Sequence, residues 1–341
     1  MKHSYYSEFK SDLISVFLLI GLMLVLGFCA FLLGQFFLGQ PFLNWISNKF
    51  YDHVRPEAWR AIFISLVVMA AIFILEIIIN GWTHSGLRRL FIRPSRTARF
   101  DWFFGFIYVL RVGGFFQILF TLGFVVILGK ALSVLIAPLV DARLHIHPVT
   151  GLGIAAAALA IWWVHTFNDY WWHRLMHTPI FWPLHRVHHT AKEMNIFTQY
   201  RGHPGDAIIT KFYALVPFSF IDASPEVLVV FTVGGALNGA LTHCSIPWGF
   251  GLLGRWLVCS PKAHHIHHST DPDHFNTNFS FLPLWDRLFG TWYIGTKAAT
   301  SFGVSDDIYE DRSIISGLWF DLKDLYLNFP KRFLELVAIK K

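Results

Sequence analysis

Long apolar stretches recur along the chain, and their lengths predict helices that cross a membrane. A spanning helix needs about 20 mainly apolar residues. Residues 13–34 meet that requirement, and no Asp, Glu, Lys or Arg occurs between positions 13 and 48. Further spans are predicted at 61–80, 112–129 and 151–167. The pattern therefore predicts a multi-pass helical protein.

A shorter apolar pair follows, at 207–221 and 227–241. The residues between its arms, Asp222-Ala-Ser-Pro225, are typical of a turn. Both arms are short and the first contains Lys211, so the pair predicts either a re-entrant or tilted hairpin or two full spans. In both cases its two ends return to the same face of the membrane.

Basic residues after the second predicted span set the expected orientation. Five arginines fall within twelve residues, at Arg88, Arg89, Arg93, Arg96 and Arg99. Cytoplasmic loops carry the excess of Lys and Arg, so this loop and the N-terminus are expected on the cytoplasmic side. Two further crossings return the chain to that side. The tail from about Ser313 mixes aromatic with charged residues, which predicts an amphipathic helix on the cytoplasmic interface.

The composition agrees with a membrane protein and excludes other classes. Hydrophobic residues make up 54% of the 341 residues, charged residues only 15%, and the mean hydropathy is +0.47. Soluble domains carry roughly 25% charge, so a typical soluble enzyme, a disordered chain and a nucleic-acid binder are excluded. The net charge of +6 suits contact with anionic lipid head groups. The expected fold is all-α, a multi-pass transmembrane helical bundle with a cytoplasmic histidine-rich helical cap.

Histidine is concentrated in one third of the chain, since 12 of the 18 histidines lie between His165 and His268. They form three motifs, His-Arg-Leu-Met-His at 173–177, His-Arg-Val-His-His at 185–189 and His-His-Ile-His-His at 264–268. Residues three and four apart share a helical face, so each motif presents imidazoles together. Imidazole is the commonest metal ligand. So many adjacent rings near membrane depth would be costly without a cation to bind.

The number of imidazoles predicts two metal ions. Without His265, the motifs supply eight rings at spacings of three and four residues, whereas a tetrahedral zinc site closes at four ligands. Two five- or six-coordinate metals would use all eight and take one or two more, for which His203 and His243 are the candidates. Asp169, one helical turn before His173, is expected to orient that imidazole through its other N–H. An isolated histidine such as His165 is expected in the core.

The three motifs, together with Arg201-Gly-His-Pro and Leu284-Trp-Asp-Arg-Leu-Phe-Gly-Thr291, resemble the fatty acid hydroxylase/sterol desaturase superfamily over roughly residues 155–295. Its members bind a dinuclear metal centre, normally iron, and use dioxygen to hydroxylate or desaturate lipids. The resemblance implies that the metal ligands here are His173, His177, His185, His188, His189, His264, His267 and His268. Some members carry a second histidine four residues before the position of His243, where this chain has Gly239.

Two iron ions are therefore expected from the resemblance, because imidazoles alone would also accept zinc, copper or nickel. The same resemblance implies an oxidoreductase, an O2-dependent lipid hydroxylase or monooxygenase. The sequence shows no flavin, nicotinamide or haem module, so electrons are expected from a separate donor of the cytochrome b5, ferredoxin or reductase type. The expected partners are this donor, a lipid substrate, O2 and membrane lipids, without nucleic acid.

Three parts are expected: N-terminal transmembrane helices at 1–150, the di-iron catalytic domain at 151–295 and the amphipathic tail at 296–341. The active site is expected on the cytoplasmic side, in the inner membrane of a bacterium or the endoplasmic reticulum of a eukaryote. Two alternatives stay open. A lipid desaturase on the same scaffold would carry the same histidines. A non-catalytic membrane metal-binding protein would need polar residues continuing through the spans, where they are sparse.

Overall fold

The computed structural model describes residues 56–92, 94–109, 144–206, 209–210 and 221–338, with a few isolated positions between 32 and 47. These residues divide between two units. The larger unit takes in 63–105, 143–307 and 320–341, and the smaller one 1–62, 106–142 and 308–319. All the residues of the site described below belong to the larger unit.

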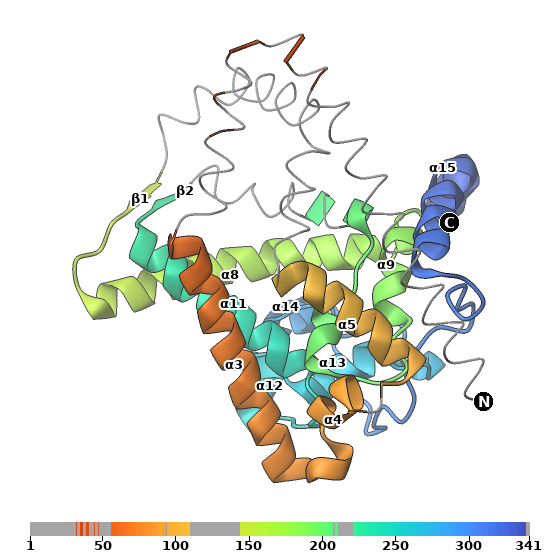
Figure 1. The fold of residues 1–341 in the computed structure, drawn as a ribbon, viewed down its shortest axis with the longest axis horizontal. Coiled ribbons are helices and arrows are strands. Elements are labelled where there is room, and N and C mark those ends of the chain that lie inside the picture. The colour runs from red at the N-terminus through yellow and green to blue at the C-terminus, as the bar shows by residue number, and fades with distance from the viewer. Residues whose placement is uncertain are drawn as a thin grey trace. The chain divides into compact units, whose positions relative to one another are not determined.

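Helices dominate the described part of the chain (Figure 1). The long ones are α3 (Pro56–Asn80), α5 (Arg96–Val109), α8 (Gly151–Met176), α11 (Pro225–His243) and α15 (Ile314–Ala338). The short ones are α4 (Gly86–Phe91), α9 (Trp182–His189), α12 (Gly251–Trp256), α13 (Pro261–His267) and α14 (Pro283–Leu288). Short 3-10 helices occur at Trp82–His84, Ile196–Tyr200 and Pro272–His274. The strands are β1 (Leu144–Ile146) and β2 (Ile221–Ala223).

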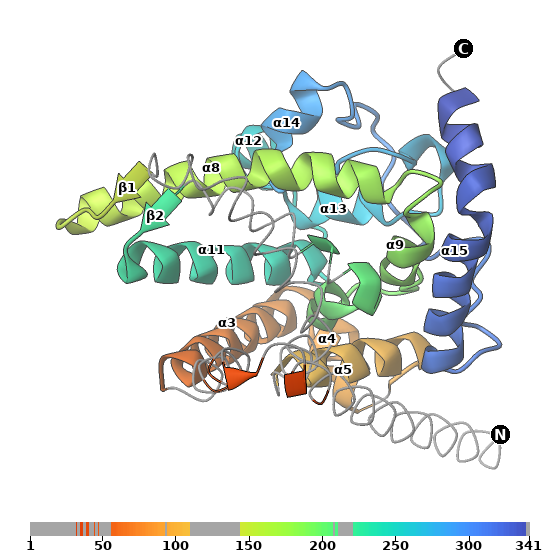
Figure 2. The ribbon, with the colours of Figure 1, turned by 90° about the horizontal axis from the view of Figure 1, so that it is seen from above.

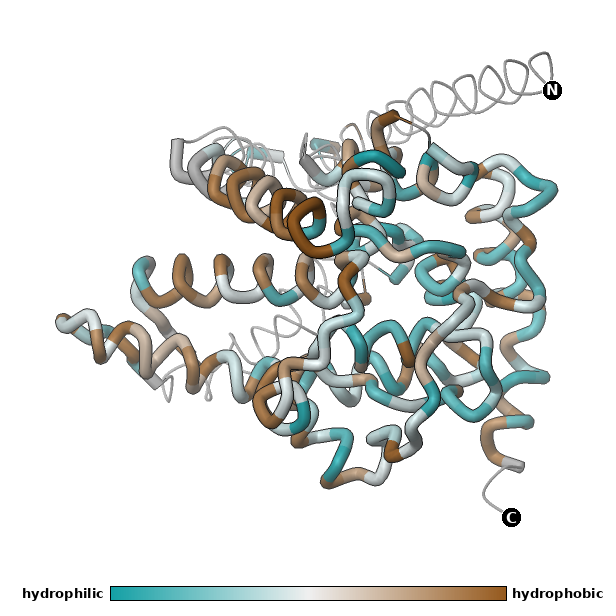
Figure 3. The backbone as a smooth tube through the Cα atoms, turned by 90° about the horizontal axis from the view of Figure 1, so that it is seen from below, coloured by the Kyte–Doolittle hydropathy of each residue, from teal (hydrophilic) through white to brown (hydrophobic). Residues whose placement is uncertain are grey.

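Among the described residues, three helices are long and apolar enough to cross a membrane, at Ile62–Asn80, Gly151–Met176 and Glu226–His243. They coincide with the predicted spans at 61–80 and 151–167 and with the second arm of the apolar pair, and hydrophobic residues recur along them in Figure 3. The spans predicted at 13–34 and 112–129, and most of the arm at 207–221, lie outside the described residues. The fourth predicted span was expected to end at 167, but α8 continues to Met176. It therefore carries part of the first histidine motif on a spanning helix.

α8 and α11 lie side by side and run in the same direction (Figure 2). Val227 near the start of α11 packs against Ala158 and Ile161 of α8. A short strand precedes each helix, and these strands pair in parallel with Leu144 opposite Ile221. This two-stranded sheet departs from the expected all-α fold, and it joins the two segments that lead into the helices. Because α8 and α11 start together, their C-terminal ends bring their histidines to the same end of the pair.

The short helices begin where the sequence favours a helix start. α9, α13 and α14 each have proline in their first turn, where the fixed φ of proline suits the helix and its missing N–H costs nothing. Ser260 caps α13, since its hydroxyl oxygen accepts the N–H of Ala263 at 3.2 Å. Helices this short are not stable alone, so packing within the larger unit must hold them in place.

The tail is helical as predicted, and ion pairs tie it to α9. Asp321 of α15 is fully buried and pairs with Arg186 of α9. Asp324 lies 3.3 Å from Arg186 and 2.7 Å from Arg332. Removing one partner of a buried pair typically costs about 3–5 kcal/mol, because the other charge stays buried. The amphipathic pattern of the tail gave no indication of this contact.

A buried carboxylate joins α3 to two later segments. Glu76 is fully buried, and its Oε2 accepts the N–H of Gly86 at 2.8 Å while its Oε1 accepts the N–H of Ser245 at 2.6 Å. Glycine at 86 permits this approach, since a Cβ there would lie 2.5 Å from Glu76 Oε2. Asn80 at the end of α3 also donates to the Ser245 carbonyl at 3.3 Å. The C-terminal end of α3 is thereby fixed beside the segment that follows α11.

We expect Glu76→Ala to lower the apparent melting temperature of the purified chain, because two buried backbone N–H groups lose their acceptor at roughly 1–3 kcal/mol each. Glu76→Gln keeps one acceptor oxygen and should lower it about half as far. Glu335→Ala is the control, since it removes a half-exposed carboxylate that lies 4.0 Å from Lys331. Equal melting temperatures for Glu76→Ala and the control would contradict this role.

Candidate metal centre

Nine histidines converge into two adjacent groups. The first group consists of His173, His177, His185, His189 and His267, and the second of His188, His243, His264 and His268. Within each group, each residue offers one ligating atom that lies within 4.8 Å of all the others. The two groups touch, since the rings of His189 and His268 stack with centroids 4.3 Å apart. Of the ten histidines that the sequence analysis singled out, His203 alone lies outside both groups.

The helical period explains which ring joins which group. In α9, His185 and His189 are four residues apart, share a face and belong to the first group. His188 is turned from His189 by about 100°, so it points into the second group. α13 divides in the same way, with the two histidines four residues apart in the second group and His267 in the first. One motif thus serves both centres.

In the first group two ring nitrogens face each other without a proton between them. His173 Nδ1 lies 2.6 Å from the Phe279 carbonyl oxygen, and His267 Nδ1 lies 2.7 Å from the Thr277 carbonyl oxygen. A carbonyl can only accept, so each Nδ1 carries the proton and each Nε2 of a neutral ring presents a lone pair. These two Nε2 atoms are 3.0 Å apart. Two lone pairs at that distance repel each other unless both point at a shared cation.

The second group repeats this arrangement. His188 Nδ1 lies 3.1 Å from the Arg201 carbonyl oxygen, and His243 Nδ1 lies 2.9 Å from that of Gly239. Their Nε2 atoms therefore also present lone pairs, and they are 3.4 Å apart. His264 Nε2 lies 2.9 Å from His243 Nε2 and completes the same cluster.

The histidines of the two groups are suited to binding metal ions and are not expected to take up additional protons. Burial lowers the pKa of His267 to about 3, and burial with the neighbouring ring of His243 lowers the pKa of His188 well below its usual value. In the described part of the chain, no hydrogen-bond partner exists for the buried Nε2 atoms of His177, His185 and His189. Imidazole binds a zinc-sized metal at about 2.0–2.1 Å, which places adjacent ligand nitrogens about 3 Å apart. The facing Nε2 atoms of both groups have this spacing.

Comparison with known proteins agrees with the geometry. Residues 158–291 match the family model for fatty acid hydroxylase. This part of the chain, rather less than half of it, is similar to fatty acid hydroxylases. An alkylglycerol monooxygenase of Caenorhabditis elegans is 28% identical over 128 residues, which are 37% of this chain and 25% of the relative. The chain thus spans about a quarter of the length of that relative. No solved structure matches significantly.

Carboxylate support in this hydroxylase domain comes from a residue that the sequence analysis missed. Asp206 Oδ2 lies 3.1 Å from His185 Nδ1 and orients that ring. Asp169 was expected to do the same for His173, but His173 Nδ1 donates to a backbone carbonyl instead. Asp169 Oδ2 is buried, with no hydrogen-bond partner among the described residues. A carbonyl leaves no signal in the sequence because every residue has one, whereas Asp206 could have been noticed three residues after His203.

His203 holds the loop that carries Asp206. It is buried, and its Nδ1 accepts the N–H of Gly205 at 2.9 Å. A Cβ at Gly205 would lie 3.0 Å from that Nδ1, so glycine allows the loop to close tightly. This geometry favours a role for His203 in shaping the loop over a role as a metal ligand.

The Leu284–Thr291 segment of the domain supports the carbonyls that two histidines use. Asp286 is fully buried, and it accepts the N–H groups of Phe279 and Ser280 at 2.8 and 2.9 Å. It also accepts the Thr291 hydroxyl at 2.7 Å. Burial raises the pKa of Asp286 to about 6. The carboxylate thus fixes the chain next to the Phe279 carbonyl, to which His173 donates.

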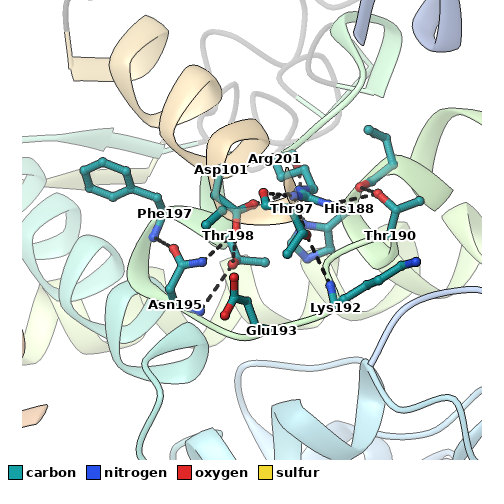
Figure 4. A network of polar contacts seen from close by, with 12 residues as sticks. Thr97, Asp101, His188, Thr190, Lys192, Glu193, Asn195, Phe197, Thr198 and Arg201 are labelled. Atoms are coloured by element: carbon teal, nitrogen blue, oxygen red, sulfur yellow. Dashed lines mark hydrogen bonds and ion pairs between the residues drawn. The ribbon is translucent and has the colours of Figure 1, made fainter. Parts of the chain in front are cut away.

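Behind the second group a buried ion pair holds the carbonyl that His188 uses (Figure 4). Arg201 Nε lies 2.7 Å from Asp101 Oδ1, and these side chains are only 2% and 0% exposed. Arg201 also donates to the Thr190 hydroxyl at 3.0 Å, and Asn195 donates to Asp101 at 2.6 Å. Asp101 lies in α5, before the matched domain begins. The sequence analysis did not single it out, because nothing in a sequence pairs two residues that far apart.

We expect His267→Ala to remove most of the bound metal, because it deletes a ligand of the first group and the nitrogen that faces His173. His84→Ala is the control, since it changes an exposed histidine outside both groups and should leave the metal content close to that of the wild type. Elemental analysis of both purified variants is the measurement. Equal metal loss in the two variants would show that the assignment of nine ligands is wrong.

We expect Asp101→Ala to weaken metal binding by about 10- to 100-fold, as loss of a group that orients a ligand typically does. It should also lower the melting temperature, since the Arg201 guanidinium loses its buried partner. Competition with a chelator measures the metal affinity. Asp271→Ala is the control, because it removes a partly exposed carboxylate that pairs with the exposed Lys297. A lower melting temperature with unchanged metal affinity would limit Asp101 to stability.

Proposed function

We propose that the chain is a membrane di-iron monooxygenase that uses O2 and electrons from a separate donor to hydroxylate a C–H bond of a lipid. The observation that carries this proposal is the pair of adjacent histidine groups, in which neutral imidazoles direct their lone pairs at two centres. The match of residues 158–291 to the fatty acid hydroxylase family supports iron as the metal. The monooxygenase relative supports insertion of oxygen.

Iron, when bound, would supply the dioxygen and one-electron chemistry that an unactivated C–H bond requires. The first group would hold one ion with five imidazoles, and the second group the other ion with four. The protein keeps the rings neutral through burial and orients them through carbonyls and Asp206. Burial of the ligands also excludes bulk water from the reacting bond, which limits side reactions.

A lipid substrate fits the position of the two groups. They lie where α8 and α11 end, and both helices have the length and composition of membrane spans. Apolar side chains such as Leu159 and Trp163 of α8 are exposed and suit contact with lipid chains. The relative is named for alkylglycerols, so we propose this class first, with fatty acids and sterols as the alternatives.

The arginine-rich loop at 88–99 supports a cytoplasmic position for the metal centre. We propose that electrons arrive there from a cytochrome b5, a ferredoxin or a reductase. The protein would then lie in the inner membrane of a bacterium or the endoplasmic reticulum of a eukaryote.

We expect cells that express the wild-type chain to convert an added alkylglycerol into a product that carries one new oxygen atom. Growth under 18O2 with mass spectrometry of extracted lipids is the measurement, because it reports the source of the oxygen. His267→Ala at equal expression is the control and should form no product. Host cells supply the electron donor, and a fatty acid and a sterol are tested in parallel.

The other outcomes distinguish the alternatives. Loss of two hydrogens without labelled oxygen would replace the hydroxylase proposal with a desaturase. No lipid change from a protein that holds its full metal content would favour a non-catalytic metal-binding protein.

A further inference from the structure

A cavity of about 450 Å³ lies beside α12 and α13, apart from the metal centre. Ala263 and Ile266 of α13 line it, whereas His264, His267 and His268 belong to the two groups. Three basic residues also line the cavity, namely Arg255, Lys262 and Arg287. Among the described residues, no Asp or Glu lines it. The cavity is therefore a concentrated positive site next to the helix that supplies the third histidine motif.

Arg287 is held in a fixed orientation at this cavity. Its guanidinium carbon lies 4.3 Å from the ring centroid of Trp256 and 4.6 Å from that of Trp292. Its Nε donates to the Arg255 carbonyl at 2.7 Å. Cation–π contacts with two rings and the hydrogen bond from Nε restrict rotation of the side chain. The planar guanidinium is thus arranged for bidentate contact with an anion.

The three cations crowd one another without a neutralising carboxylate. Burial and the Arg255 guanidinium lower the pKa of Arg287 from its ordinary value. Lys262 adds a third charge to the same cavity. In the part of the chain that the structure describes, no ion pair involves any of the three. An anion in the cavity would offset this repulsion.

The cavity also lies at the level where two candidate spans end. α12 begins eight residues after His243, the end of the span in α11, and Ser245 between them is hydrogen-bonded to Asn80 at the end of the span in α3. Figure 2 shows α12 next to α14, beyond the paired α8 and α11. The surface here is apolar, since Leu252 and Leu253 of α12 are 74% and 61% exposed. Exposed Leu and Trp beside Arg and Lys are typical of a segment that lies among lipid head groups.

We propose that this cavity binds the phosphate of an anionic lipid head group at the membrane surface. The charge complementarity selects an anion, the two tryptophans and the guanidinium suit a phosphate, and the apolar side chains of α12 select a lipid over a soluble ion. The proposal does not rest on the catalytic activity. The segment between α11 and α14 would then contact a lipid at a place separate from the metal centre.

The test uses the full chain purified in a non-ionic detergent with its metal bound. Phosphatidylglycerol and phosphatidylcholine with the same acyl chains are titrated in, and native mass spectrometry measures how much of each lipid is retained. The wild type should prefer phosphatidylglycerol. A basic side chain near an anionic surface contributes about fivefold to affinity, so Arg255→Gln/Lys262→Gln should bind phosphatidylglycerol roughly 25-fold more weakly, with phosphatidylcholine unchanged.

Two controls make the result specific. Lys323→Gln/Lys331→Gln removes the same charge from α15 and should keep the wild-type preference. The metal content of Arg255→Gln/Lys262→Gln should equal that of the wild type, which shows that the variant folds. If the double variant loses metal, the single variant Lys262→Gln is tested instead, because that side chain is exposed. It should bind phosphatidylglycerol about fivefold more weakly than the wild type.

Three results would overturn the proposal. Equal retention of the two lipids by the wild type would remove the preference for an anion. Equal loss in the α15 control would show a general effect of charge. Displacement of phosphatidylglycerol by excess inorganic phosphate would show a site for soluble anions and not for a lipid.

Discussion

The structure depends on one electrostatic constraint, which is that neutral imidazoles with opposed lone pairs are held within about 3 Å of each other. His173 and His267 show it most clearly, because each Nδ1 is committed to a carbonyl and the Nε2 atoms are 3.0 Å apart. Without a cation, this arrangement repels itself. With one, every nitrogen has a partner. The fold must therefore hold the rings rigidly enough that a metal, and not relaxation of the side chains, resolves the conflict.

That rigidity comes mostly from the backbone. Helices α8 and α11 start together at a parallel pair of strands and end together at the histidines. Three segments, at 201, 239 and 277–279, supply the carbonyls that fix Nδ1 atoms. Asp286 holds one of these segments through two N–H groups, and the Asp101–Arg201 pair holds another. A carbonyl is a fixed dipole that does not titrate near neutral pH, so it sets the tautomer without competing for the metal.

Repeating patterns in the sequence predicted the helices and the histidine motifs. The contacts between residues far apart in the sequence follow no such pattern and were not predicted. The spans at 61–80 and 151–167 and the apolar arm at 227–241 follow from apolar runs alone, and the structure has helices there. The spacing of the motifs singled out eight histidines, and the structure places these eight together with His243 in two groups. The orientation of His173 was wrongly expected from Asp169, since a pattern of side chains cannot show that a backbone carbonyl lies closer. The Asp101–Arg201 pair joins residues 100 positions apart, and only the folded chain shows it.

The position of these supporting residues bears on where the functional unit ends. The family match covers 158–291, but the partners of three buried groups within it lie elsewhere. Arg201 pairs with Asp101, Arg186 pairs with Asp321, and the N–H of Ser245 donates to Glu76. A chain cut at 151 and 295 would leave two guanidinium groups buried without counter-charges, at about 3–5 kcal/mol each. Small domains have a free energy of unfolding of only about 5–15 kcal/mol, so that loss is comparable to the whole stability of such a domain. The unit able to hold the metals therefore includes α3 to α5 and most of α15 as well as the matched residues.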